Sequence, residues 1–318
     1  MTERPSSLRH ALIVLSVLAT IVAMGQSPHL AQGDSLLKLD KPQRALEAYD
    51  RAIGEAPSAP AYLGRAKANL ALNRNDPFLL DLERALRIDS TLAEAHHLRA
   101  VYSLRGQDMP NAALHADRAV QMSRDEKLTA QSRLVRGLAN AELKQPEKAI
   151  EDLEHGLNAG IDDLEAMRTL ARLYDAAGRH EDALTVLEKL TTLEPYEVGH
   201  WSNRAFELIQ LQRFDEALTM IEKALLLDKD EPVALSNRAY IHYHQQKDKE
   251  AFVDVERSLK SYPTNAYALR TRALLRLRKG DRAKACEDLM LAKVLANIPE
   301  VDRLVNEHCA DQASPKKR

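Results

Sequence analysis

Apolar and polar positions along this chain alternate with the period of amphipathic helices. Between residues 26 and 298, apolar side chains recur three and four positions apart, in runs separated by short polar or glycine-containing breaks. This spacing places the apolar side chains of each run on one face of a helix. The stretch from Trp201 to Leu227 shows the plan, with one apolar run before the Gln212-Arg213 break and a second run after it. The pattern predicts an all-α chain of repeated helix–turn–helix units.

Triplets of small residues set the length of the unit. The second residue follows the first by 12 positions and the third follows the second by 7, and the triplet occurs eight times. Successive triplets are offset by 33, 34, 37, 34, 34, 34 and 34 residues. Small side chains allow helices to approach closely, whereas a larger side chain at such a position costs about 1–3 kcal/mol of overpacking. The triplets are Gly33/Ala45/Ala52, Ala66/Phe78/Ala85, Ala100/Ala112/Ala119, Gly137/Ala149/Gly156, Ala171/Ala183/Leu190, Ala205/Ala217/Ala224, Ala239/Ala251/Ser258 and Ala273/Ala285/Ala292.

Two irregularities in this series carry expectations of their own. Phe78 and Leu190 depart from the small-residue rule, and we expect the repeat around Phe78 to be locally distorted. The 37-residue offset falls near residues 124–131. It predicts a longer connection between repeats, where the array bends or a partner docks.

Aromatic residues and closing segments complete the pattern within individual units. Tyr62 and Trp201 begin first helices, and Leu193-Glu194-Pro195 closes a second helix. Together with the recurrent spacing, such features make residues 26–298 resemble the tetratricopeptide repeat family. The resemblance implies a right-handed superhelical α-solenoid of eight repeats, in which the first helices line a concave groove and each repeat packs on its neighbours.

Arginine and aspartate recur at fixed places in the units. An arginine precedes the first small residue in six units, and in four of these an aspartate follows sixteen residues later. Because this offset connects the first helix of a unit to its second, we expect ion pairs within repeats. Partly exposed pairs are worth about 0–1 kcal/mol each, so a structural role is favoured over a binding ladder of arginines. The arginines are Arg65, Arg99, Arg136, Arg204, Arg238 and Arg272, and the aspartates are Asp81, Asp152, Asp254 and Asp288.

The first 25 residues differ in kind from the repeats. Arg4 and Arg9 precede an uncharged apolar run, residues 11–25, which ends at Gly25. A basic start, an apolar stretch of this length and small residues at its end are typical of an export signal. Cleavage after Gly25 leaves the repeats intact, and the alternative is an uncleaved membrane anchor near the minimum length for a span. Either interpretation places the repeats outside the cytoplasm, with membrane contact only through residues 11–25.

The two cysteines fit an oxidising compartment. Cys286 lies early in the last second helix, and Cys309 lies near the end of a further helical stretch. Antiparallel packing brings these ends together, so we predict a disulfide, worth roughly 3 kcal/mol, that holds a capping helix at residues 299–310. The alternatives are two free thiols or a zinc site completed by His308, although a fourth zinc ligand is not evident. We expect residues 311–318 to form a disordered tail.

Charge and motifs narrow the class of function. The formal net charge is −2 and the pI is near 6.6, which provides no basic footprint for nucleic acid. The sequence contains no recognisable nucleophile, phosphate-loop or four-ligand metal motif, so we predict no catalytic residue, no metal and no cofactor. For the eleven histidines, solvated or packed side chains are the default interpretation.

The first helices offer a candidate binding surface. On their face away from the second helices, four aromatic residues from three consecutive units point the same way, with two asparagines at matching places. Aromatic anchors supply most of the binding energy in such patches, and amides can hold a peptide backbone. The flanking arginines favour an acidic group on the partner. The predicted partner-binding residues are Asn203, Phe206, Asn237, Tyr240, Tyr243, Tyr267, Arg270, Arg168 and Arg172.

These observations favour a non-catalytic scaffold outside the cytoplasm, which binds a peptide or protein partner in its groove. Such a scaffold would belong to an envelope assembly or to a secretion or export complex. A structural or oligomerising module is the second interpretation, and an enzyme or carbohydrate-binding subunit is the third. The groove aromatics are equally consistent with packing between neighbouring first helices.

Overall fold

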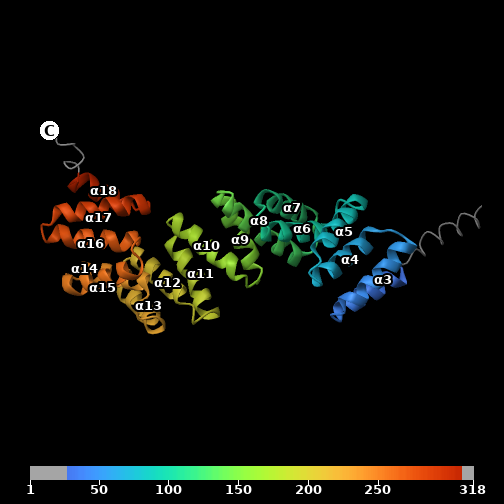
Figure 1. The fold of residues 1–318 in the computed structure, drawn as a ribbon, viewed down its shortest axis with the longest axis horizontal. Coiled ribbons are helices and arrows are strands. Elements are labelled where there is room, and N and C mark those ends of the chain that lie inside the picture. Colours follow the sequence, from blue (N-terminus) through green and yellow to red (C-terminus); the bar gives the residue numbers. More distant parts are fainter. Residues whose placement is uncertain (1–26, 310–318) are drawn as a thin grey trace, which may run out of the picture. The chain divides into compact units, whose positions relative to one another are not determined.

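The computed structural model describes residues 27–309, and the regular elements in this range are all helices (Figure 1). The predicted export signal at residues 1–25 and the predicted tail at 311–318 lie outside the described residues. Within the described range, no helix combines the length and the apolar character that a membrane span requires. Contacts divide the chain into two compact units that meet in sequence between Ile161 and Asp162.

The N-terminal unit consists of four helix pairs. The two helices of a pair are joined by a short turn and pack against one another, and each second helix also packs on the first helix of the next pair. The pairs are α2 (Pro28–Lys38) with α3 (Pro42–Glu55), α4 (Ala59–Ala71) with α5 (Asn75–Ile88), α6 (Ala93–Arg105) with α7 (Met109–Met122), and α8 (Glu126–Glu142) with α9 (Pro146–Asn158).

The C-terminal unit contains four more pairs and one further helix, packed in the same way. Its pairs are α10 (Leu164–Ala176) with α11 (His180–Leu193), α12 (Val198–Gln210) with α13 (Phe214–Leu227), α14 (Pro232–His244) with α15 (Asp248–Ser261), and α16 (Ala266–Arg278) with α17 (Arg282–Leu295). The last helix is α18 (Pro299–His308). Within the described residues, these elements confirm the predicted all-α solenoid of eight helix–turn–helix repeats with a capping helix.

The turn inside every helix pair has the same backbone geometry. One residue adopts a positive φ, and the amide of the next residue donates to a carbonyl oxygen five positions earlier, as from Arg213 to Leu208 at 2.8 Å. This hydrogen bond is that of a Schellman motif, which satisfies carbonyl groups left free where a helix ends. In the eight turns inside helix pairs, the residues with positive φ are Asp40, Asn73, Gln107, Lys144, Gly178, Gln212, Gln246 and Gly280.

Small side chains lie where the helices approach most closely. The alanines of the sequence triplets are buried, and most of them have no exposed surface. A Cβ atom at Gly33 would lie 2.6 Å from Cε1 of Tyr49, and one at Gly156 would lie 2.4 Å from Cδ2 of Leu134. Packed carbon atoms do not approach this closely, so these positions require glycine where a large side chain fills the space between helices.

The large residue Phe78 and the 37-residue offset are both accommodated within continuous helices. Phe78 lies in α5, which is continuous, and its ring is fully buried 5.7 Å from the ring of Tyr102. The local distortion expected around Phe78 is not seen in this helix. The longer connection expected from the 37-residue offset is wrong, because the additional residues extend α8 to 17 residues, against 13 in α6.

Four ion pairs link the two helices of a repeat, as the sequence predicts. In each pair, Nε and Nη2 of the arginine donate to the two carboxylate oxygens of the aspartate at 2.7–3.0 Å. The aspartates are only 2–4% exposed, so the expectation of partly exposed pairs is wrong for the carboxylates. The hydrogen bonds to these carboxylates raise the pKa of all four arginines. The pairs are Arg65–Asp81, Arg136–Asp152, Arg238–Asp254 and Arg272–Asp288.

Three of these arginines also contact the second helix of the preceding repeat through Nη1. One side chain therefore connects three helices, which couples the geometry of a repeat to that of its neighbour. The contacts are Arg65 to Asp50 at 2.7 Å, Arg136 to Asp117 at 2.5 Å and Arg272 to Glu256 at 3.0 Å.

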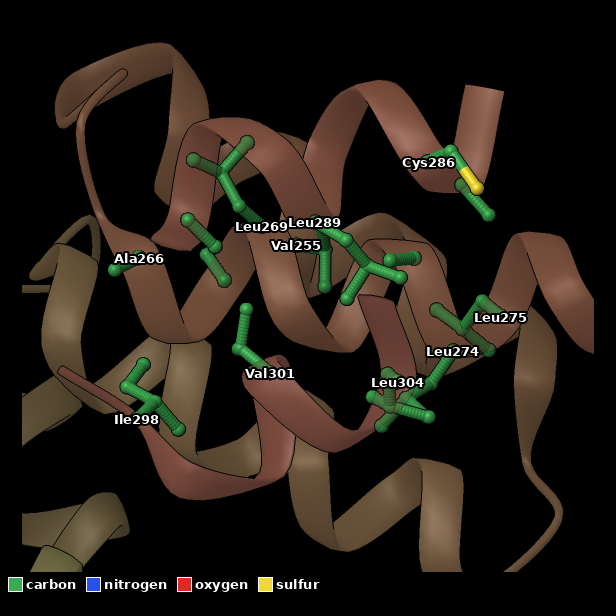
Figure 2. Close-up of a cluster of buried hydrophobic side chains, with 14 of the residues drawn as sticks. Val255, Ala266, Leu269, Leu274, Leu275, Cys286, Leu289, Ile298, Val301 and Leu304 are labelled. Atoms are coloured by element: carbon green, nitrogen blue, oxygen red, sulfur yellow. The ribbon is translucent and has the colours of Figure 1, made fainter. Parts of the chain in front are cut away.

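The capping helix closes the C-terminal unit. Val301 and Leu304 of α18 point into a buried cluster that also contains Leu269 of α16 (Figure 2). Cys286 of α17 and Cys309 after α18 form a disulfide, with Cα atoms 5.6 Å apart. This is the pairing that the sequence analysis favours over free thiols or zinc. The crosslink restricts the unfolded chain and thereby stabilises the packed helix.

Removing the arginine of one buried pair is expected to destabilise the fold strongly. Arg238→Met leaves the carboxylate of Asp254 buried without its bidentate partner, and an uncompensated buried charge costs about 3–5 kcal/mol. The double variant Arg238→Met/Asp254→Leu, which removes both charges, should recover most of this loss. Urea unfolding followed by circular dichroism gives the free energies of unfolding.

Arg257→Met is the matched control for this experiment. Arg257 pairs with Asp230 at 2.8 Å, where the two side chains are 40% and 54% exposed. We expect its loss to change the free energy of unfolding by less than about 1 kcal/mol. Equal losses in Arg238→Met and Arg257→Met would contradict a special contribution from the buried pair.

A histidine pair between α6 and α7 makes stability depend on pH. Nδ1 of His96 lies 3.0 Å from Nδ1 of His115. Burial, followed by the positive charges of His96, Arg99 and Arg118, lowers the pKa of His115 to about 4. An unfolded histidine titrates near its ordinary value of about 6.5, so the unfolded state binds this proton at a higher pH than the folded state.

The free energy of unfolding should therefore fall as the pH is lowered from about 6.5 to about 4. We expect His115→Gln to remove about 1–2 kcal/mol of this decrease, because the variant has no imidazole to protonate in either state. His155→Gln, at an exposed position of α9, should leave the decrease unchanged. Urea unfolding at pH 7, 6, 5 and 4 gives the free energy of unfolding as a function of pH. Identical pH dependence for His115→Gln and the parent chain would contradict the prediction.

Candidate functional site

The C-terminal unit contains a cavity of about 770 Å³ on the side formed by its first helices. α10, α12, α14 and α16 each contribute side chains to it, and the segment that joins α17 to α18 completes its wall. This volume lies in the range of sites that bind small ligands or short peptide segments. The lining of this cavity, which we call the aromatic pocket, includes Asp175, His180, Phe206, Phe214, Tyr240, His244, Tyr267, Arg270, Ile298 and Glu300.

Aromatic rings from successive repeats meet in the aromatic pocket. The rings of Phe206 on α12 and Tyr267 on α16 lie edge to face, with 5.1 Å between their centroids. Tyr240 and His244 of α14 form a second such pair at 4.4 Å. Phe206, Tyr240 and Tyr267 are each half-buried, so they are held by their neighbours and still present surface to a ligand.

Arg270 stacks on two of these rings. Its guanidinium carbon lies 4.2 Å from the ring centroid of Tyr240 and 5.4 Å from that of Tyr267. Its Nη1 atom lies 3.3 Å from Glu300 of α18. The ring faces and Glu300 compensate the charge of this side chain, which is only 8% exposed. Its buried Nε atom has no acceptor among the described residues.

Two carboxylates and one imidazole meet where α10 turns into α11. Nδ1 of His180 lies 2.8 Å from Oε2 of Glu207 and 3.9 Å from Oδ1 of Asp175. Glu207 belongs to α12 and is 3% exposed. Burial raises the pKa of Glu207 to about 7, with help from the charge of Asp175 and against the hydrogen bond from His180. Burial also raises the pKa of Asp175.

These three side chains, which we call the Asp175–His180–Glu207 group, have donor atoms of the kinds that bind metal ions. The donor atoms all lie within 4.8 Å of one another. Within residues 27–309, this is the group that could hold a metal ion. No metal site is predicted from the sequence, because Glu207 is distant from Asp175 and His180 along the chain and the three residues match no ligand motif.

The aromatic pocket contains four of the nine predicted partner-binding residues: Phe206, Tyr240, Tyr267 and Arg270. Asn237 is 5% exposed, and its Nδ2 atom donates to the carbonyl oxygen of Ser202 at 3.0 Å. This hydrogen bond joins α14 to α12.

The other predicted residues lie outside the lining of the aromatic pocket. Arg168 pairs with Glu194 at 2.6 Å, and the guanidinium of Arg278 covers the ring of Tyr243 at 3.9 Å. Arg168 and Arg270 therefore each have a carboxylate partner within the chain. The five residues outside the lining are Asn203, Asn237, Tyr243, Arg168 and Arg172, of which Asn203, Arg168 and Arg172 are exposed.

The Asp175–His180–Glu207 group was not predicted from the sequence, although the repeats carry a signal for it. Asp175 comes four positions after the first small residue of its repeat, where the other seven repeats have apolar or aromatic residues. Glu207 comes two positions after the first small residue, where neighbouring repeats have buried leucine or isoleucine. The residues matching Asp175 are Leu37, Leu70, Leu104, Ala141, Ile209, Tyr243 and Leu277, and those matching Glu207 nearby are Leu173, Ile241 and Leu275.

Comparison with solved structures agrees with the fold. YrrB, a TPR protein with an unusual peptide-binding site, is 21% identical, with a TM-score of 0.53, and the match covers 60% of this chain and 97% of YrrB. The C-terminal part of a TPR repeat-containing protein from Cytophaga hutchinsonii is 18% identical, with a TM-score of 0.51, and the match covers 76% of this chain and 98% of that chain.

Sequence comparison supplies the family. A comparison with curated proteins finds no match. Two sequence models, each described as a tetratricopeptide repeat, match residues 30–93 and 203–266 in one case and 164–197 in the other, together half of the chain. The matched segments fall in both units and coincide with helix pairs described above. The chain belongs to the tetratricopeptide repeat family.

Proposed function

We propose that the chain is a non-catalytic interaction scaffold whose C-terminal unit binds an extended peptide segment of a protein partner in the aromatic pocket. The observation that carries this proposal is the convergence of Phe206, Tyr240 and Tyr267, from three successive repeats, on one cavity of about 770 Å³. Buried aromatic anchors dominate the binding energy of protein interfaces. Solenoid proteins of this kind bind partners along surfaces formed by successive repeats.

The polar groups of the aromatic pocket suit a peptide backbone. Burial raises the pKa of both Tyr240 and Tyr267, so their hydroxyl groups remain protonated and can donate to carbonyl oxygens. The unpaired Nε of Arg270 is a further donor that needs an acceptor. A peptide partner also agrees with the peptide-binding site of YrrB, which shares the fold.

Truncation of the pocket aromatics is expected to abolish peptide capture without unfolding the chain. Peptides selected from a random display library on the full chain would be synthesised, and their dissociation constants measured by fluorescence anisotropy. Phe206→Ala and Tyr267→Ala should each weaken binding by about thirtyfold or more, because hot-spot aromatics contribute about 2 kcal/mol or more. The melting temperature of each variant is recorded alongside.

Tyr196→Ala provides the matched control, since Tyr196 is 84% exposed and lies outside the aromatic pocket. It should bind the selected peptides as tightly as the parent chain. Selected peptides that bind Phe206→Ala and the parent chain equally would refute the proposal. So would a loss of binding that is fully matched by a fall in melting temperature, because the aromatics would then act as core.

We also propose that the repeats work outside the cytoplasm. The apolar run at residues 11–25, after Arg4 and Arg9, supports export. The disulfide between Cys286 and Cys309 supports an oxidising compartment, because cytosolic thiols are kept reduced.

Mass spectrometry of the protein from its own cells tests this location. We expect a mature chain that begins at Gln26, or a full-length chain in the membrane fraction if the segment is retained as an anchor. In both cases Cys286 and Cys309 should resist alkylation until a reductant is added. A full-length chain in the cytosolic fraction with both thiols free would rule out export.

A further inference from the structure

We propose that Asp175, His180 and Glu207 form a binding site for a divalent transition-metal ion of the zinc class, open toward the aromatic pocket. This site goes beyond peptide binding and does not depend on it. Three helices supply the donors: Asp175 lies near the end of α10, His180 begins α11, and Glu207 lies in the middle of α12. The donor atoms converge within 4.8 Å, although the residues span more than thirty positions of sequence.

Both carboxylates stand where the adjacent repeats have apolar or aromatic side chains. In the neighbouring repeats, the position of Glu207 is held by Leu173, Ile241 and Leu275, which are 6%, 0% and 0% exposed. The position of Asp175 is apolar or aromatic in every other repeat. A carboxylate at a core position is costly unless it is compensated. Departures from a consistent core pattern are expected at functional sites.

The group lacks a full compensating charge of its own. Glu207 is 97% buried, and outside the group no described residue donates a hydrogen bond to it. Its hydrogen-bond partner is Nδ1 of His180 at 2.8 Å, and Asp175 brings a second carboxylate to the same place. A divalent cation bound there would supply positive charge between the two carboxylates.

The donor set selects the class of ion. Imidazole nitrogen and carboxylate oxygen are both ligand types that zinc accepts, and three protein ligands leave a position open for water or another ligand. Calcium requires six to eight oxygen ligands and magnesium retains most of its water, so neither is suited to a site that includes a histidine. The adjoining cavity of about 770 Å³ gives room for water or a partner's donor group at the remaining position.

The side chains already stand close to a coordinating arrangement. Nδ1 of His180 faces both carboxylates, at 2.8 Å from Oε2 of Glu207 and 3.9 Å from Oδ1 of Asp175. Ligand atoms about 2.0–2.2 Å from a tetrahedral ion are spaced roughly 3.3–3.6 Å apart, so small rotations suffice. Histidine binds metal ions through a ring nitrogen, and Nδ1 is the ring nitrogen of His180 that faces both carboxylates.

Isothermal titration of the tag-free full chain with ZnCl₂, after treatment with a chelator, tests the site. We expect one ion per chain, with release of protons that is detected as a dependence of the heat on the buffer. His180→Ala and Glu207→Gln should each weaken binding by more than about a hundredfold, because outer-shell partners alone are worth about 10- to 100-fold. CoCl₂ should give visible absorption bands in the parent chain and lose them in both variants.

Two histidine variants distinguish zinc binding at this site from nonspecific zinc binding elsewhere on the chain. His115→Ala disrupts the close pair of imidazoles that His96 and His115 form. His155→Ala removes an exposed imidazole. Both should bind zinc as the parent chain does. Absence of a one-to-one complex would overturn the proposal, and so would zinc affinity that survives His180→Ala or calcium affinity equal to that for zinc.

Glu207→Leu restores the residue type of the neighbouring repeats and guards against a trivial loss of folding. The metal-free variant should melt at a higher temperature than the parent chain, because a buried carboxylate is replaced by an apolar side chain. It should nevertheless fail to bind zinc. A variant that is both more stable and still able to bind the ion would exclude Glu207 as a ligand.

Discussion

Helices in this chain pack side by side only because small side chains recur where their axes come closest. Ala239, Ala251 and Ser258 of one repeat have no exposed surface, and the equivalent residues of the other repeats are buried in the same way. Where the equivalent residue is Gly33, even a single methyl group would collide with the ring of Tyr49. Each hairpin can therefore bury its apolar face only against the next hairpin, so stability accumulates along the chain through neighbour contacts.

This packing constraint is reinforced by polar contacts that repeat with it. The buried Arg–Asp pairs hold the two helices of a hairpin at a fixed separation, and in three of the four pairs the arginine also contacts the preceding repeat. The turns that join the helices share one backbone geometry, although six of the eight place a residue other than glycine at positive φ. Backbone hydrogen bonding thus fixes the turn, and the side-chain identity at that place is secondary. The repeated geometry therefore tolerates different residues at positions whose side chains are neither buried between helices nor part of an ion pair.

The spacing of small residues was sufficient to predict the helix pairs, because a buried contact that recurs with the repeat leaves a periodic trace in the sequence. Phe78 shows the limit of that inference, since a large residue at a small position is accommodated by its neighbours, which no single position reveals. The added residues before Gly137 extended α8, because helix length and loop length are indistinguishable by offset alone. In the candidate site, the face of a side chain was predictable but its partner was not, as Asn237 and Tyr243 demonstrate.

Repetition makes functional departures visible that would be hidden in an irregular fold. Eight copies of one backbone provide their own reference, so a charged residue at a position that is otherwise apolar can be recognised without any relative of the chain. Asp175 stands where the other seven repeats have apolar or aromatic residues, and Glu207 stands where six of the other seven do. The donor atoms of both residues converge on one place. Two independent random substitutions would have no reason to place their side chains at the same point. Each carboxylate would also lower the stability of the fold, and replacing it with leucine would restore that stability. The two carboxylates converge beside a half-buried aromatic cluster. This placement argues that the C-terminal unit is less stable than it would be with an apolar core here, and that the polar side chains serve binding.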